Sequence, residues 1–324
     1  MRAAGGHSAE EQISIAANLL HKNALVAESN PHAWFQNAPS ADDISEVTTD
    51  NRMISYPYTK RMNAIMDVDQ AAAVVIVSDK YLEASGKRSQ AAAILGGAGA
   101  EEIWNPMQRR SLSTCIGMEV AFEATLASAG VSVEDIDAFD FYSCFPVTVE
   151  LALDTLEIST NDPRPFSITG GLAYGGGPGN NYVMHSLATA VQHLRDNRKE
   201  LIMITGVGMA NTKHTATILA AADKVPSKAT GKTVYRLTTG DQEVPVAMEA
   251  SGTCTIATYT IEYNREGEPT NVIYILDTAA GERAIANARH PAAVAPELLA
   301  SDPIGRIGEL SWDAELGRQF FALD

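Results

Sequence analysis

The chain has 324 residues, 45% of them hydrophobic, and its 24 basic and 40 acidic side chains give a formal net charge of −16. This acidic balance argues against a nucleic-acid surface and against attraction to anionic membranes. The longest apolar runs, such as LIMITGVGMA, are well short of the roughly 18 to 20 residues that a membrane-spanning helix needs. We therefore expect a soluble protein of about two domains, with no membrane span and no nucleic-acid partner.

The cysteines and the first residues bear on compartment and on metal binding. Cys115, Cys144 and Cys254 are odd in number and scattered along the chain, so they indicate neither a disulfide framework nor a zinc site. The start, MRAAGGHSAEEQ, lacks the basic region and apolar stretch of a secretory signal. The sequence therefore predicts a cytoplasmic protein without a metal centre.

The first region, residues 1–89, is predicted to contain a helix and then a strand followed by a helix. Ser8 lies three residues before Glu11, which is the capping-box spacing, and apolar residues follow at helical intervals. The run from Ala71 to Val77 is short, continuous and half β-branched, which is typical of a strand buried on both faces. Ser78 and Asp79 are suited to cap a helix directly after it.

The second region, residues 90–240, repeats this alternation of strands and helices. AAAILGGAGA predicts a strand that enters a glycine-rich turn, and a helix over Met118–Ser128 is expected to end at Gly130. Further strands are expected in DAFDFYSCF and ELIMITGVGM, and further helices in PVTVELALDTL and NNYVMHSLATAVQHLRDN. The pattern predicts a layered α/β fold with a largely parallel or mixed sheet, in which ligands bind where strands end and helices begin.

The third region, residues 241–324, has a different pattern. TCTIATYTIEYNREGEPTNVIYILDT contains two alternating β runs joined by the turn-rich linker NREGEPTN, which indicates a hairpin with a slightly long loop. Short strands and turns continue through DPIGRIGELSW. We expect a small, separate β domain, barrel-like in character.

Several of these segments, taken in order, resemble the thiolase superfamily. DVDQAAAVVIVSDKYLEA resembles the family's DGAAAVVLMS segment, and the stretch ending in YSCF is similar to the one that leads into its NEAF or HDCF loop. GGLAYGGGPGNNY resembles the family's GGALALGHPIGASG loop, and LIMITGVGM takes the place of the strand that carries its CxG loop. The tail resembles the additional C-terminal domain of thiolase-like proteins. The resemblance implies a thiolase-like layered α-β-α fold, with the N-terminal half largely missing, plus a small C-terminal β domain.

The resemblance also implies what this chain lacks. In thiolases the nucleophilic cysteine lies in the N-terminal half, upstream of the helix with which this chain opens. We therefore expect the missing half, or a partner subunit that supplies it, to complete the fold. Without it, strand edges and an apolar sheet face would be exposed, and the chain alone is expected to be incomplete or to fold poorly.

The family's catalytic positions are altered in this sequence. Gly177 stands where the resemblance places the histidine of GHP, and Gly206 stands where it places the cysteine of CxG. Tyr142 aligns with the asparagine of NEAF. Since glycine cannot move a proton, thiolysis through the family's own residues is not expected. Gly176, Gly177, Gly206, Gly208 and Asn180 remain candidates to bind a coenzyme A thioester through backbone close to the ligand.

Other side chains are candidates to replace the missing proton carriers, and each has a structural alternative. His185 is either catalytic or an ordinary helix histidine, and His214, beside Lys213, is either a contact for a coenzyme A phosphate or substrate carbonyl or a packed residue. Tyr142 and Cys144 stand at a strand end, although a cysteine there is more often buried than reactive. Asn180 or Asn181 is suited to cap the helix that follows.

The resemblance implies an acyltransferase-like protein of acyl-CoA metabolism, with the coenzyme A thioester as substrate and no tightly bound cofactor. Two alternatives remain. One is a noncatalytic acyl-CoA-binding or scaffold subunit, and the other is a thiolase-like carbon–carbon lyase that uses tyrosines such as Tyr142 and Tyr182. All three readings expect residues 142, 177 and 206 to surround one hollow.

Overall fold

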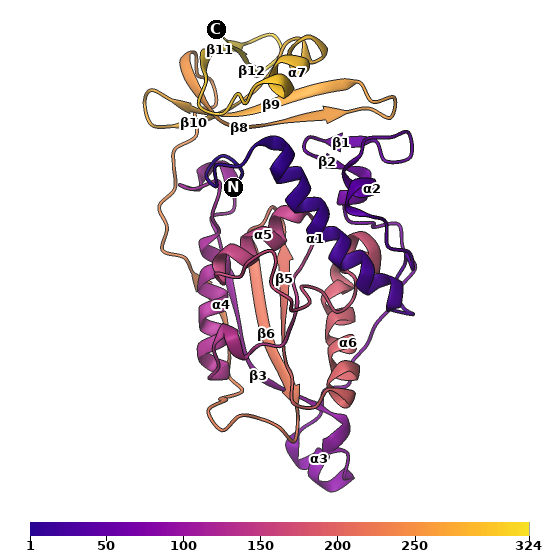
Figure 1. The fold of residues 1–324 in the computed structure, drawn as a ribbon. Helices are drawn as coiled ribbons and strands as arrows, with labels where there is room; N and C mark the ends of the chain where they lie inside the picture. Colours follow the sequence, from indigo (N-terminus) through magenta and orange to yellow (C-terminus); the bar gives the residue numbers. More distant parts are fainter. Residues whose placement is uncertain (324) are drawn as a thin grey trace.

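The computed structural model describes residues 1–323. These contain two β-sheets, which lie one above the other along the long axis of the molecule (Figure 1). One sheet has five strands in the order β4-β5-β6-β3-β7. These are β3 (Ala92–Glu101), β4 (Ala138–Asp140), β5 (Leu201–Gly208), β6 (Lys213–Ala221) and β7 (Thr233–Thr238). The β4–β5 and β3–β7 pairs are parallel and the two central pairs are antiparallel, so the sheet is mixed, as the sequence predicts.

The second sheet has seven strands in the order β11-β12-β10-β9-β8-β1-β2. Its strands are β1 (Met53–Ser55), β2 (Tyr58–Thr59), β8 (Gly252–Tyr263), β9 (Pro269–Thr278), β10 (Arg283–Asn287), β11 (Ile307–Asp313) and β12 (Arg318–Leu323). The α-helices of the described residues are α1 (Ala9–Ser29), α2 (Ala41–Ser45), α3 (Asp79–Ser85), α4 (Ile116–Ala129), α5 (Pro146–Thr155), α6 (Tyr182–Asp196) and α7 (Pro291–Ala300).

Helices cover both faces of the five-stranded sheet. Met203 of β5 belongs to the core that α4 and α5 share with the sheet, whereas its neighbours Ile202 and Ile204 pack with Ala190 and Leu194 of α6. Successive strand residues point to opposite faces, so each apolar run in the sheet serves two cores. The result is a layered α-β-α body, with α6 on one face and α4 on the other (Figure 1).

The helix boundaries follow local chemistry that the sequence predicts. Ser8 caps α1 in a full capping box, in which its hydroxyl accepts from the Glu11 amide and the Glu11 carboxylate accepts from the Ser8 amide. Helix α4 ends at Gly130, which has a φ of 69° in the left-handed region. Ser78 caps α3 by accepting from the Tyr81 amide. These three predictions are confirmed.

The predicted glycine-rich turn after the first strand of the second region is wrong, because its glycines lie inside β3. A Cβ on Gly96 would lie 2.6 Å from the Ala129 amide nitrogen and 2.8 Å from the Ser128 carbonyl carbon. Helix α4 therefore crosses β3 at backbone contact. Glycine is needed at Gly96 for this close packing and not for a turn.

The predicted strand over Ala71–Val77 is also wrong. These residues belong to no strand in the described structure and run from near α1 down to α3 (Figure 1). Val75 is 89% exposed and Ile76 is 86% exposed, which is the opposite of the predicted burial on both faces. The residue types are those of a buried strand, but residues 1–323 provide no neighbouring strand for it.

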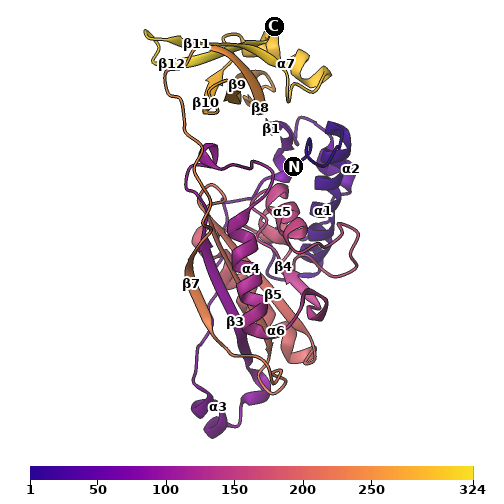
Figure 2. The same cartoon turned by 90° about the vertical axis from the view of Figure 1, so that its left-hand side faces the viewer.

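The C-terminal sheet contains the predicted hairpin and also strands from the first region. Strands β8 and β9 pair antiparallel around the NREGE segment, which confirms the hairpin. β1 pairs with β8 through Ser55 and Glu262, and the Tyr56 amide donates to the Ile261 carbonyl at 2.8 Å. Figure 2 shows this sheet above the helical body, with the connecting segment between β7 and β8 leading up to it. Within the described residues, no helix has the length and apolar character needed to cross a membrane.

Candidate functional site

A pocket of about 200 Å³ lies at the ends of β5 and β6, where the sequence predicts a ligand site. It is lined by Tyr142, Gly179, Asn180, Val183, Gly206, Val207, Gly208, Lys213 and Thr215. Four of the nine predicted site residues meet here, namely Tyr142, Asn180, Gly206 and Gly208. The pocket is smaller than the roughly 300 to 1,000 Å³ that small-molecule sites usually occupy, so it has room for only one end of a larger ligand.

The antiparallel register of β5 and β6 sets the lining of this pocket. Gly206 pairs with Thr215, and Gly208 pairs with Lys213. These residues share the face that α6 covers, and Val183 of α6 closes one side. A Cβ on Gly206 would lie 2.6 Å from the Thr215 hydroxyl oxygen, so a side chain at this position would displace Thr215.

Tyr142 enters the pocket from the segment that follows β4. Its amide donates to the Thr205 hydroxyl at 2.9 Å, and its ring meets the Tyr182 ring edge-on, with 5.4 Å between centroids. Burial raises the pKa of the Tyr142 phenol above its usual value of 10.0, so the phenol is neutral at physiological pH. Tyr142 is therefore a hydrogen-bond donor in the pocket and not a base.

The buried carboxylate of Asp140 holds the surroundings of Tyr142 in place. One of its oxygens accepts from the Tyr182 hydroxyl at 3.0 Å and the Ser186 hydroxyl at 2.7 Å. The other accepts from the Ser167 and Thr169 hydroxyls and from the amides of residues 168 and 169, at 2.9 to 3.2 Å. Burial, and next the Asp140 charge, raise the pKa of Tyr182 well above its usual range. Tyr182 is 1% exposed, so it supports Tyr142 and does not reach the pocket.

The glycine-rich loop before α6 is packed inside the fold. Gly170 and Gly176 have φ values of 102° and 112°, and a Cβ on Gly176 would lie 2.2 Å from the Gln70 side-chain oxygen. The Gly176 amide donates to the Gly171 carbonyl, and the Gly177 amide donates to the Ile65 carbonyl at 2.8 Å. Both amides are used within the chain, and neither residue lines the pocket. The hollow therefore includes residues 142 and 206 but not 177.

Three further candidates also lie outside the pocket lining. His185 faces back along α6, with its Nε2 3.4 Å from the Asn181 side-chain nitrogen, and burial, followed by the nearby His32, lowers its pKa. Asn181 precedes α6 but makes no side-chain cap. The Cys144 thiol lies 3.8 Å from the Thr148 hydroxyl, and burial raises its pKa.

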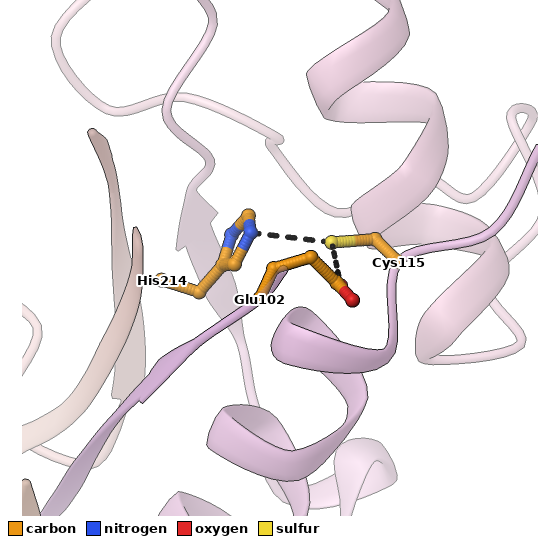
Figure 3. Close-up of side chains that lie close together, drawn as sticks. All are labelled: Glu102, Cys115 and His214. Carbon is orange, nitrogen blue, oxygen red and sulfur yellow. Dashed lines mark hydrogen bonds between the residues drawn. The ribbon is translucent and has the colours of Figure 1, made fainter. Parts of the chain in front are cut away.

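His214 lies on the other face of the same sheet, although it stands between two pocket residues of β6. It is 1% exposed, and burial lowers the pKa of its imidazole to about 4. Its Nε2 is 3.2 Å from the Cys115 sulfur and 3.1 Å from the Asn211 carbonyl oxygen. The Cys115 thiol is 3.5 Å from a Glu102 carboxylate oxygen, and burial raises the pKa of this thiol to about 12 (Figure 3).

Sequence reasoning did not anticipate this Glu102, Cys115 and His214 cluster. Glu102 directly follows β3, Cys115 precedes α4 by one residue, and His214 belongs to β6. Cys115 is 13 residues from Glu102 and 99 residues from His214 in the chain. The only signal was the pairing of two apolar strands, each with a polar residue near its end. The register Ala100 to His214 brings two of the three elements together.

Lys213 is the exposed cation of the pocket. Its ammonium group lies 4.7 Å from the centroid of the Trp104 ring, which places the charge beside an aromatic face. The residues that line the pocket include neither a histidine, a cysteine nor a carboxylate. The arrangement offers one positive charge, one phenol and three glycines, and these can bind a polar or anionic group.

A larger cavity of about 730 Å³ lies between the C-terminal sheet and the body. It includes none of the predicted site residues. Two of its arginines are already paired, Arg283 with Asp277 at 2.8 Å and Arg2 with Asp302 at 2.6 Å. We place the candidate site at the strand ends because there the lining matches the positions that the sequence singles out.

Comparison with known proteins finds one match to the C-terminal region and one to the whole chain. The family described as thiolase-like protein type 1 additional C-terminal domain matches residues 236–315. The crystal structure of a monomeric SCP2-thiolase-like protein type 1 from Mycobacterium smegmatis superposes with a TM-score of 0.85 at 27% identity, covering 100% of this chain and 71% of that one.

Curated relatives match the chain over a shorter stretch. Sterol carrier protein 2 of Oryctolagus cuniculus and that of Homo sapiens are each 23% identical over 138 residues, which is 42% of this chain. The chain spans about a quarter of their length, since the match covers 24% of each. With the layered body, the additional C-terminal sheet and these matches in agreement, the chain is a member of the thiolase-like superfamily with a thiolase-like layered fold.

Proposed function

We propose that this chain binds a coenzyme A thioester, with the thioester end in the strand-end pocket. One observation carries the proposal: Tyr142, Gly206 and Lys213 surround the same hollow at the mouth of β5 and β6. Lys213 offers a charge for a phosphate or carbonyl oxygen, and Tyr142 offers a neutral donor. Because the pocket holds about 200 Å³, most of the coenzyme A would lie outside it.

The lining supports binding without the family's acid–base chemistry. Gly206 stands where the resemblance places the cysteine of CxG. His214, the histidine of β6, faces away from the pocket. His185 does not line the pocket either. A noncatalytic acyl-CoA-binding role therefore fits the geometry better than thiolysis by this chain alone.

Binding is tested by titrating coenzyme A and acetoacetyl-CoA into the purified chain in a calorimeter. Lys213→Ala removes the pocket's cation and should raise the dissociation constant about 5-fold, equivalent to about 1 kcal/mol. Lys224→Ala is the matched control, because this exposed lysine lies beyond the opposite end of β6. Asn180→Trp should fill the hollow from an exposed loop position. Equal affinities for the parent and both pocket variants would contradict the proposal.

A second function, carbon–carbon cleavage of a 3-hydroxyacyl-CoA, is favoured by the position and the neutral phenol of Tyr142. As the carbon–carbon bond breaks, the half-buried neutral phenol of Tyr142 is suited to give its proton to the enolate carbon, and the phenolate then takes up, through water, the proton that the substrate's 3-hydroxyl loses. Tyr182 is not available for this step, since its hydroxyl is enclosed with Asp140. If Tyr142 acts in this way, Tyr142→Phe lowers the cleavage rate by at least 100-fold, a loss much larger than its effect on affinity. An unchanged rate removes Tyr142 from the mechanism.

We also propose that another segment, from the same polypeptide or from a partner subunit, covers residues 71–77. The support is the exposure of Val75 and Ile76, at 89% and 86%, in a run with strand composition. The chain also spans 71% of the length of the thiolase-like protein that it matches throughout. A strand added beside this run would bury its apolar side chains.

A further inference from the structure

The buried cluster of Glu102, Cys115 and His214 has no role in the pocket chemistry. Their side chains come from the residue after β3, the residue before α4 and the second residue of β6, which meet at one end of the sheet on the α4 face (Figure 3). Glu102 is 4% exposed, Cys115 4% and His214 1%. The cluster therefore lies behind the strand-end pocket, separated from it by the thickness of β6.

The side-chain types and spacing are those of a transition-metal site. The sulfur of Cys115 is 3.2 Å from His214 Nε2 and 3.5 Å from Glu102 Oε2, and the three ligand atoms all lie within 4.8 Å of one another. Zinc bonds of about 2.0 to 2.3 Å arranged tetrahedrally place neighbouring ligand atoms about 3.3 to 3.6 Å apart. The two sulfur distances are close to this spacing without any rearrangement of the backbone.

Within the part of the chain that the structure describes, the buried carboxylate of Glu102 has no ion pair to balance its charge. Glu102 accepts from the Gly117 amide at 2.8 Å but makes no ion pair within residues 1–323. The nearby guanidinium of Arg109 is directed instead at the Ile103 and Ala210 carbonyls and the Thr212 hydroxyl. A buried carboxylate is ordinarily paired with a cation or bound to a metal.

The second ring nitrogen of His214 has no hydrogen-bond partner among the described residues. Within residues 1–323, the buried side-chain atoms without a hydrogen-bond partner are Gln70 Oε1, Asn211 Oδ1 and His214 Nδ1. Because Nε2 is the nitrogen that contacts the Cys115 sulfur, Nδ1 is free to carry the imidazole proton while Nε2 faces the cluster.

We propose that Glu102, Cys115 and His214 bind one zinc-type divalent metal ion. The ion bonds to the Cys115 sulfur, a Glu102 oxygen and His214 Nε2; the thiol proton leaves to solvent, and the imidazole proton moves from Nε2 to Nδ1. Coordination replaces the contact of Nε2 with the Asn211 carbonyl. The ion joins the end of β3, the start of α4 and the start of β6, and so stiffens the strand that supplies Lys213 and Thr215 to the pocket.

The test uses the purified full chain, stripped with a chelator and then titrated with Co²⁺ and with Zn²⁺. We expect one equivalent of zinc per chain after desalting, and with Co²⁺ an ultraviolet sulfur-to-cobalt charge-transfer band with visible ligand-field bands. Substoichiometric zinc together with no charge-transfer band in the parent chain would overturn the proposal, whatever the variants do.

Matched variants then assign the ligands. Cys115→Ala should abolish the charge-transfer band, whereas Cys254→Ala, which removes another buried free cysteine, should keep it. Glu102→Gln and His214→Gln should each weaken zinc binding at least 10-fold, and His185→Gln should not. Circular dichroism shows whether each variant is folded. A band that persists in folded Cys115→Ala places the metal elsewhere and refutes the assignment.

Discussion

Asp140 allows a direct test of how the fold positions the pocket, through the substitution Asp140→Asn. The carboxylate accepts six hydrogen bonds, four at one oxygen and two at the other. An amide keeps one accepting oxygen and presents an NH₂ group in place of the second. The hydroxyls of Tyr182 and Ser186 would then have to turn round or lose their acceptor.

The expected loss of folding stability follows from the hydrogen bonds that the substitution removes. A hydrogen bond to a charged group contributes about 1.5 to 3 kcal/mol, and two of them are replaced by weaker neutral contacts. We therefore expect Asp140→Asn to lower the free energy of unfolding by about 3 kcal/mol. At about 2 °C per kcal/mol for a chain of this size, the melting temperature should fall by about 6 °C.

Urea denaturation followed by circular dichroism measures this loss, with Asp137→Asn as the control. Asp137 is exposed and accepts one bond, from the Leu201 amide at 2.8 Å, so its substitution should cost less than about 0.5 kcal/mol. The reasoning is refuted if the two variants are equally stable. In that case Asp140 does not organise the surroundings of Tyr142.

Three other substitutions test separate parts of the structure. Gly96→Ala should destabilise the body by about 1 to 3 kcal/mol in thermal melts, because its Cβ would lie 2.6 Å from the α4 backbone, whereas Gly99→Ala, whose nearest contacts are side chains at 3.3 Å, should cost less. Burial raises the pKa of Glu150 above 4.5, so the folded state binds this proton more tightly than the unfolded state and loses stability as the pH rises from 4.5 through the folded-state pKa. Glu150→Gln should therefore have a higher melting temperature than the parent at pH 8 but not at pH 4. A difference in melting temperature that is the same at both pH values would contradict this. The double change Val75→Ser and Ile76→Ser should leave the melting temperature unchanged and reduce self-association in size-exclusion chromatography, and a lower melting temperature would mean that these side chains pack within the chain.

The sequence predicts most local structure well because short-range chemistry decides it. Ser8 with Glu11, Gly130 and Pro146 mark helix ends through groups within a few residues of one another, and the structure has helix ends at all three places. The β8–β9 hairpin follows from alternation and a turn. In each case the information lies in one contiguous stretch.

The errors arise where a distant segment decides the outcome. Gly96 is adjacent to α4 only in space, so the sequence alone does not distinguish a glycine needed for packing from one needed for a turn. Ala71–Val77 has the composition of a strand, but pairing depends on a neighbour that residues 1–323 do not supply.

The candidate site was predictable in part for the same reason. The resemblance to thiolases and the ends of the apolar runs together identify Tyr142, Gly206 and Gly208, which line the pocket. The face that each side chain occupies depends on register, and this separates His214 from Lys213 although they are adjacent in sequence. The internal hydrogen bonds of Gly176 and Gly177 become evident only once the loop is folded against residues 65 and 171.

The pairing of β1 with β8 means that the two sheets are not independent modules joined by a tether. Removing residues 241–324 would leave the edge formed by Ser55 and Tyr56 without its neighbour β8. A protease cut between residues 239 and 250 would leave two fragments that stay joined by the β1–β8 pairing. Separating the C-terminal portion as a unit would therefore require residues 53–59 to go with it.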